Sequence, residues 1–205
     1  GVYFICVFMP VSIAAALLEV LRRPVPKWLT WTGIVSAFCV AAYTGFLLGV
    51  VSAYPLWNNA ILPVLFVVSA LSAGLAATSL VGLITDRERF EQMWLIKKSH
   101  VILSAIEMVV LATMLIIVSS GSPEGAASVA SLVSGQYAPM FWGGLVLLGL
   151  VAPFAIEGYP VFVTRKVETS TTSMVVSVIG EGGVLVGGFM LRLLVILAAL
   201  PVLYL

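Results

Sequence analysis

The chain has 205 residues, of which 61% are hydrophobic and 9% are charged, and its mean hydropathy is +1.18. Soluble domains carry roughly 25% charged residues. Ten basic and nine acidic side chains cannot cover a soluble protein of this length without leaving large apolar patches. Their near balance also provides no field that attracts polyanions. The composition therefore excludes a soluble enzyme, a nucleic-acid-binding protein and a disordered chain, and predicts an all-α, polytopic membrane protein.

The apolar segments have the length of membrane-spanning helices. A helix needs about 20 mostly apolar residues to cross the hydrocarbon core, and these segments are too long and too continuous for the alternating strands of a barrel. We therefore expect one integral-membrane domain over residues 1–205. Because the chain starts without Met inside an apolar run, we interpret Gly1 as a point within a longer protein. The predicted spans are 2–20, 31–52, 61–84, 100–118, 139–163 and 174–200.

The basic residues predict the orientation of these spans. Nine Lys and Arg residues fall in three alternate connections, and the two connections on the opposite side, 53–60 and 119–138, contain none. The positive-inside rule then places the three basic loops in the cytoplasm. Segment 119–138 is small and polar, and we expect either a flexible loop or a short re-entrant or partner-contacting element. The basic residues are Arg22, Arg23 and Lys27 in loop 21–30, Arg87, Arg89, Lys97 and Lys98 in loop 85–99, and Arg165 and Lys166 in loop 164–173.

Cofactor ligands are scarce. The chain has two cysteines, Cys6 and Cys39, and one histidine, His100. An iron–sulfur cluster takes four thiolates, a bis-imidazole haem takes two histidines, and a structural zinc site takes four Cys or His ligands. We therefore expect no haem, no iron–sulfur cluster, no metal and no catalytic residue in this chain. We interpret the cysteines as small buried apolar residues, and Gly183 and Gly187 as sites of close helix packing.

Ionisable residues inside membrane spans are costly and point to function. His100 and Glu107 are seven residues apart, so they share a helix face about 10 Å apart. Glu181 and Arg192 are eleven residues apart and share a face about 16 Å apart.

One interpretation of these groups is a polar path, in which Glu107, Glu181 and His100 carry protons. The other interpretation is structural, with Glu and Arg pairs that fix the packing; we prefer it for His100 and for the boundary residues Glu19 and Glu157. The predicted order from the cytoplasm outward is Glu19, Glu157 and His100, then Glu181 and Glu107, then Arg192.

Tyr43 and Thr44 lie in the outer half of the second predicted span. A tyrosine phenol there can donate a hydrogen bond to a ligand carbonyl. The alternative is a packed tyrosine bonded to a neighbouring helix.

Segment 42–77 resembles the membrane subunits of the polysulfide reductase family, also called the NrfD type. Later pieces are similar too: His100 followed by Glu107, the run "FWGGLVLLGLVAP", and a last helix that ends at Arg192. The motifs of the segment are Tyr43-Thr44-Gly45, Pro55-Leu56-Trp57-Asn58, Leu62-Pro63-Val64-Leu65-Phe66, Ser69-Ala70 and Gly74.

The resemblance implies eight helices in two four-helix bundles, of which the six spans here are the last six and about two helices precede them. It implies a quinone-reactive anchor of a molybdopterin oxidoreductase in a prokaryotic cytoplasmic membrane. Menaquinone or ubiquinone would be bound as substrate from the quinone pool. The implied partners are an iron–sulfur electron-transfer subunit and a molybdopterin catalytic subunit.

The resemblance also implies site residues. Tyr43, with Thr44 and Arg192, would bind the quinone near the outer face, and the outer loop would contact the iron–sulfur subunit through Trp57, Asn58 and Asn59. Family residues on the helices that precede this chain would complete the quinone site. Two other functions stay open: a secondary transporter or channel, whose sites also use mid-membrane ionisable groups, and a pure anchor without quinone chemistry.

Overall fold

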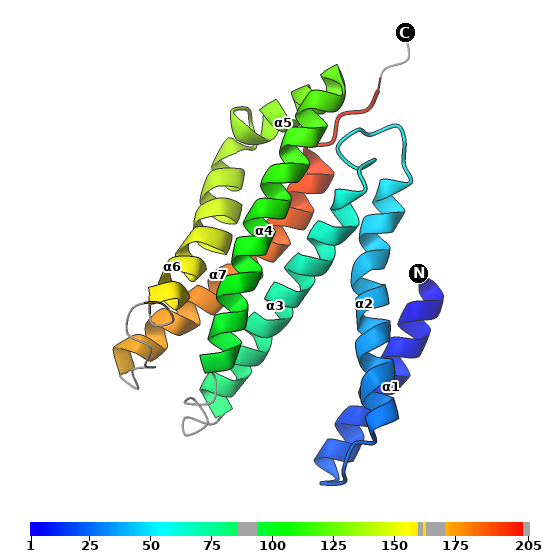
Figure 1. Cartoon of the computed structure of the whole chain (residues 1–205), viewed down its shortest axis with the longest axis vertical. Coiled ribbons are helices and arrows are strands. Elements are labelled where there is room, and N and C mark those ends of the chain that lie inside the picture. The colour runs from blue at the N-terminus through cyan, green and yellow to red at the C-terminus, as the bar shows by residue number, and fades with distance from the viewer. Residues whose placement is uncertain (86–93, 160–161, 163–170, 203–205) are drawn as a thin grey trace.

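The structure is a computed structural model that describes residues 1–85, 94–159, 162 and 171–202, and these residues form helices without any strand (Figure 1). The all-α prediction is therefore confirmed. In chain order the helices are α1 (Val2–Val20), α2 (Lys27–Gly49), α3 (Ile61–Thr85), α4 (Trp94–Gly121), α5 (Pro123–Val133), η2 (Met140–Val151), α6 (Ala152–Tyr159) and α7 (Thr171–Leu197).

Six helical segments are long and apolar enough to cross a membrane, as predicted, and α6 continues η2 within the fifth. Several boundaries shift by a few residues, and two helix starts differ most from the prediction. The second span begins at Lys27, directly after Pro26, whose extended backbone precedes the helix. Residues 94–99, expected in a loop, belong to α4. The six spans are Val2–Val20, Lys27–Gly49, Ile61–Leu83, Lys98–Gly121, Met140–Gly158 and Val175–Leu197.

Four of the spans form a bundle, and the first two lie beside it. Helix α7 packs against η2, α6 and α3, while α4 packs against α3, α5 and α6. Helix α2 packs on α3, and α1 packs on α2 (Figure 1). We call α3, α4, η2–α6 and α7 the bundle. That two further helices precede the chain stays a prediction.

The ends of the helices fit the predicted orientation. The α1–α2 connection, the end of α3, the start of α4, the end of α6 and the start of α7 all lie at the lower end in Figure 1. We call this the basic end because the basic loops adjoin it. Four of the basic residues, Arg87, Arg89, Arg165 and Lys166, lie outside the described residues.

Glycines permit the closest helix contacts in the bundle. A side chain on Gly149 of η2 would collide with the backbone of Gly187 on α7, and one on Gly187 would collide with Gly149. Gly183 stands in the same way against the carbonyl of Leu148. The prediction that Gly183 and Gly187 allow close packing is therefore confirmed. In α2, Gly45 packs against Pro63 of α3, so two of the family motifs are in contact.

Segment 119–138 is structured, and the expectation of a flexible loop is wrong. Helix α5 begins after Ser122, whose Oγ accepts a hydrogen bond from the Gly125 amide at 3.0 Å. Pro123 at the first helical position suits this start. The Ser128 Oγ accepts a hydrogen bond from the amide of Leu200 at 3.1 Å. This contact ties α5 to the segment that follows α7.

The apolar core lies in the bundle and continues under α5 and the α2–α3 loop. In contrast, α1 has no buried residue, and Cys6 on it is exposed, so the expectation of a buried Cys6 is wrong. The core comprises Leu56, Leu62, Leu65, Phe66, Leu111, Met114, Val118, Leu132, Phe141, Leu145, Leu150, Leu191, Leu194, Val195 and Ala198.

Candidate functional site: a buried polar seam

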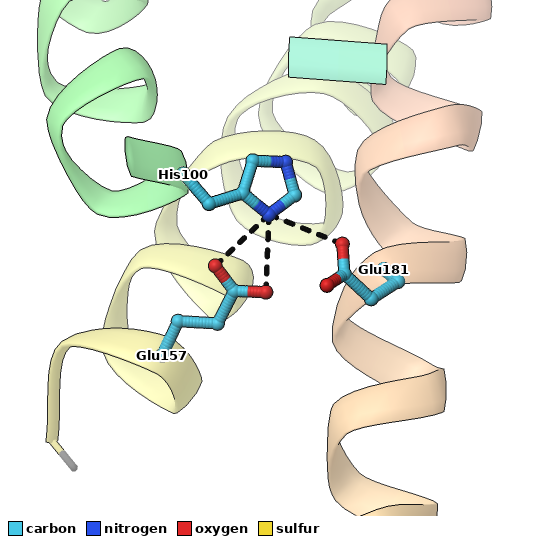
Figure 2. A group of neighbouring side chains, drawn as sticks. All are labelled: His100, Glu157 and Glu181. Carbon is cyan, nitrogen blue, oxygen red and sulfur yellow. Dashed lines mark hydrogen bonds and ion pairs between the residues drawn. The ribbon is translucent and has the colours of Figure 1, made fainter. Parts of the chain in front are cut away.

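Three ionisable side chains meet inside the bundle near its basic end. His100 comes from α4, Glu157 from α6 and Glu181 from α7, and each is at most 1% exposed. The His100 Nδ1 lies 3.1 Å from Oε1 and 2.9 Å from Oε2 of Glu157, and 3.1 Å from Oε2 of Glu181 (Figure 2). We call these three residues the His100 cluster.

The other ring nitrogen determines the tautomer of His100. Its Nε2 lies 3.0 Å from the backbone oxygen of Ser72 on α3. A carbonyl oxygen only accepts hydrogen bonds, so Nε2 carries a hydrogen. Nδ1 then either donates a proton to a carboxylate, as an imidazolium, or accepts one from a protonated carboxyl group. The cluster is thus built to share protons among three buried groups.

Helix packing brings the cluster together. The glycine contacts described above draw α7 against η2, and α6 follows η2 directly, so Glu157 and Glu181 approach each other. The backbone of η2 has π-helical turns with i to i+5 hydrogen bonds. Such turns change the register of the residues that follow, and they are frequent at functional sites.

A second buried carboxyl group extends the polar region. Glu107 of α4 is 3% exposed; it lies beside Ser69 and Ser72 of α3 and within electrostatic range of His100 and Arg192. Ser69, Ser72 and Ser79 are each 1% exposed.

Arg192 of α7 lies at the other end of this region. Its Nη1 donates to the backbone oxygen of Gly188 at 2.6 Å. Its guanidinium lies over the ring of Phe66, 5.6 Å from the centroid. The His100 cluster, Ser72, Ser69, Glu107 and Arg192 therefore form a continuous polar seam between α3, α4, α6 and α7.

The seam contains most of the residues predicted for the polar path. The structure places His100 and Glu181 in direct contact and sets Glu107 beside them. Glu157, predicted only at the mouth, belongs to the cluster itself. Glu19 is exposed on α1, which packs on α2, so its place in the seam is wrong.

The serines of α3 were not predicted as site residues. Their spacing is the signal that could have identified them. Ser69, Ser72, Ala76 and Ser79 follow one another at three, four and three residues, which puts small and polar side chains on one helix face. All four are buried.

The three predicted quinone residues lie in different surroundings. Tyr43 of α2 is half-buried, with its ring against Gly1 at the start of α1. Thr44 is exposed, and its Oγ1 donates to the backbone oxygen of Ala41 at 3.3 Å. Arg192 belongs to the polar seam. The structure therefore does not bring Tyr43, Thr44 and Arg192 into one described cluster.

The residues of the predicted partner loop also lie in different surroundings. Trp57 is half-buried, and its indole Nε1 donates to the backbone oxygen of Val195 on α7 at 2.7 Å. The Oδ1 of Asn59 accepts from the amide of Ile61 at 2.9 Å, at the start of α3. Asn58 is exposed. Asn58 and Asn59 line a cavity of about 350 Å³ that reaches the α4–α5 junction.

The His100 cluster is also the one place among the described residues where three metal-ligating side chains converge, with ligand atoms within 4.8 Å of one another. The expectation of no metal counted only cysteine and histidine ligands. However, the distances from Nδ1 to the carboxylate oxygens are those of direct hydrogen bonds. Proton sharing accounts for this geometry without an ion.

Comparison with known proteins places the protein in a family. The family described as "Polysulphide reductase, NrfD" matches residues 4–203. The sequence is similar to the Protein NrfD homolog of Haemophilus influenzae, with 28% identity over 80% of this chain and 50% of that relative. It is similar to one subunit of the polysulfide reductase of Wolinella succinogenes, with 33% identity over 60% of this chain and 40% of that relative. Protein NrfD of Escherichia coli K12 is 30% identical over 87% of this chain and 54% of that relative.

The chain thus spans about half the length of the curated relatives that it matches. We found no solved structure that matches it.

Proposed function

Because the chain belongs to the NrfD family of polysulphide reductase proteins, we propose that it is the quinone-reactive membrane subunit of an oxidoreductase complex, and that its polar seam moves protons. The observation that carries the proposal is the buried His100 cluster and its continuation to Glu107. A multi-pass membrane chain with these groups at its centre fits a subunit that couples quinone chemistry to proton movement.

Each part of the seam has a chemical role in this proposal. The His100 cluster holds protons near the basic end because an imidazole and two carboxyl groups exchange them over distances of 2.9–3.1 Å. Glu107 takes protons deeper into the membrane. Arg192 provides a fixed positive charge that keeps excess protons from passing beyond Glu107.

In this proposal, a menaquinone or ubiquinone from the membrane pool binds near the outer face. Tyr43 would donate its phenol hydrogen to a quinone carbonyl, with Thr44 beside it and Arg192 on the side of the seam. The head group supplies or takes two electrons and two protons.

The electrons would pass to or from an iron–sulfur subunit, and a molybdopterin subunit would hold the catalytic centre. We propose that the iron–sulfur subunit docks at the outer loop, where Asn58 is exposed beside the cavity that it lines with Asn59. Trp57 would hold this loop in place through its hydrogen bond to Val195. The basic end would face the cytoplasm of a prokaryotic cell.

The substitution Glu107→Gln in the full-length protein, purified within its complex, tests the proposal. A glutamine keeps the shape of the side chain but cannot take up a proton, so we expect quinone-linked turnover to fall by about 100-fold. Glu19→Gln, an exposed carboxyl group on α1, is the matched control and should leave turnover unchanged. Equal turnover in both variants would remove Glu107 from the path.

The substitution Tyr43→Phe tests the quinone site. Loss of the phenol should raise the KM for quinol, whereas Tyr3→Phe on the exposed start of α1 should not. If the intact complex did not bind quinone, this result would favour a pure membrane anchor. A preparation without iron or molybdenum that transports an ion would favour a transporter.

A further inference from the structure

Hydroxyl groups on the helices of this protein differ in their hydrogen-bond partners. A serine or threonine within a helix ordinarily donates its hydroxyl to a backbone oxygen one turn earlier. Ser36 of α2 does so, with its Oγ 2.7 Å from the oxygen of Thr32, and Thr78 of α3 does so with Gly74 at 2.9 Å. Ser69, Ser72 and Ser79 of α3 do not: they are buried, their Oγ atoms make no hydrogen bond to a described backbone oxygen, and Ser69 and Ser72 face the carboxyl group of Glu107.

These three serines form a polar face of α3, which we call the serine face. Ser69 and Ser72 are about 4.5 Å apart along the helix axis, and Ser72 and Ser79 about 10.5 Å. Ser72 also accepts the His100 Nε2 hydrogen through its backbone oxygen. The serine face therefore passes the His100 cluster, with Ser69 on the Glu107 side and Ser79 toward the basic end.

A fourth buried oxygen lies at the same level. The Oε2 of Glu181 contacts Nδ1 of His100 at 3.1 Å, and no other group in the described part of the chain bonds it. Leaving a buried polar atom without a partner destabilises the folded protein. Internal water is the usual partner of such atoms. Four of them along one seam point to several waters rather than one.

The backbone of α7 comes close to the serine face at Gly188. Gly188 of α7 has no side chain, and a methyl group built there would lie 3.4 Å from Nη1 of Arg192 and 3.6 Å from Oγ of Ser69. Its next neighbour would be Cβ of Ala73, at 3.8 Å. A side chain at this position would therefore touch both the guanidinium of Arg192 and the hydroxyl of Ser69.

We propose that the serine face holds a chain of internal waters that links the His100 cluster to Glu107 and ends at Gly188 and Arg192. This inference rests on the proposed proton path and identifies its connecting elements. Each water accepts a proton from one neighbour and passes one to the next, so a proton that leaves the cluster arrives at Glu107 without any net change in the waters. Ser69, Ser72 and Ser79 are positioning residues that hold the waters.

Gly188→Ala is the sharpest test, because its methyl group would touch the Ser69 hydroxyl and the Arg192 guanidinium without a collision and would compete with a water bonded to them. Its matched control is Gly182→Ala on the same helix, where a methyl group meets no described atom within 4 Å. We expect Gly188→Ala to slow proton uptake by the full-length protein in its complex by about tenfold, a part of the roughly 100-fold that loss of an acid–base group causes. Gly182→Ala should match the wild type.

Serine variants provide a second test. Ser69→Ala and Ser72→Ala should each slow proton uptake and lower its solvent deuterium isotope effect, because a step other than water-mediated transfer then limits the rate. Ser36→Ala, which removes a buried hydroxyl bonded within its own helix, is the control. Equal rates in Gly188→Ala, Ser69→Ala, Ser72→Ala and the controls would overturn the inference.

A direct measurement does not depend on proton transport. A cryo-EM map of the complex that is sharp enough to show water should contain density within hydrogen-bond distance of Ser69 and Ser72, and the density near Gly188 should be lost in Gly188→Ala. A map without water density beside Ser69 and Ser72 would overturn the inference, and the Glu107→Gln test of the proposed function would not be affected. Ordered waters together with unchanged turnover in Glu107→Gln would instead overturn the proposed function.

Discussion

The α1–α2 pair and the bundle are similar in hydropathy but differ in what they bury. Span Val2–Val20 has a mean hydropathy of 2.1 and none of its residues is buried, whereas Val175–Leu197 has 1.8 and 44% are buried. The polar seam has five ionisable residues. Two of them lie on α4, two lie on α7, and Glu157 lies on α6. Since lipid tails are as apolar as leucine, hydropathy does not separate a lipid-facing helix from a packed one. Small residues and buried polar groups do.

The largest expected effect comes from removing the centre of the His100 cluster. His100→Ala leaves the carboxyl groups of Glu157 and Glu181 buried without their shared partner, and breaking a buried pair in this way costs about 3–5 kcal/mol. Unfolding of the full-length protein in detergent micelles should show this loss. Glu19→Ala on α1 is the control and should not change the unfolding midpoint. A small loss for His100→Ala would mean that the carboxyl groups hold their own protons.

Leucine truncation compares the two regions directly. Leu191 is 1% exposed in the bundle and Leu17 is 56% exposed on α1. Leu191→Ala should lower the free energy of unfolding by about 2–4 kcal/mol because it leaves a cavity, and Leu17→Ala should leave it nearly unchanged. Similar losses at both positions would show that α1 is packed against protein as tightly as the bundle.

Overpacking of the glycine contact should have the next largest effect. Gly149→Val places a branched side chain against the Gly187 backbone and forces α7 away from η2, which costs about 1–3 kcal/mol. Gly74→Val meets open space among the described residues and serves as the control. The measurement is the same detergent unfolding series, and equal midpoints would contradict the close contact of η2 and α7.

The smallest effect concerns α5. Ser122→Ala removes the oxygen that accepts the Gly125 amide, and loss of such an N-terminal cap costs about 1 kcal/mol. Hydrogen exchange at the first turn of α5 should accelerate, while exchange in α4 should stay unchanged. No change at α5 would mean that its packing contacts, and not the Ser122 cap, hold this helix.

Much of the fold could be predicted from the sequence because a membrane span depends on length and hydropathy alone. The six spans, the glycine contact at Gly187 and the shared face of His100 and Glu107 follow from such local rules. Helix α5 was not predicted as a helix, although Ser122 and Pro123 form an ordinary helix start.

The His100 cluster could not be predicted from spacing. Glu157 and Glu181 approach His100 only because three helices pack at one register, and the π-helical turns of η2 shift that register. The serine face was missed for another reason. Serine is common in membrane helices, and its sequence position does not tell whether the hydroxyl bonds its own backbone, as in Ser36, or faces a buried group of another helix, as in Ser72.

One measurement tests the central claim most directly. The full-length complex is placed in liposomes with a pH indicator inside, and proton movement is recorded during quinone-linked turnover for the wild type and for Glu181→Gln. The polar seam predicts that Glu181→Gln slows proton movement and turnover together, while Glu124→Gln on α5 slows neither. Wild-type proton movement in Glu181→Gln would contradict a proton path through the His100 cluster.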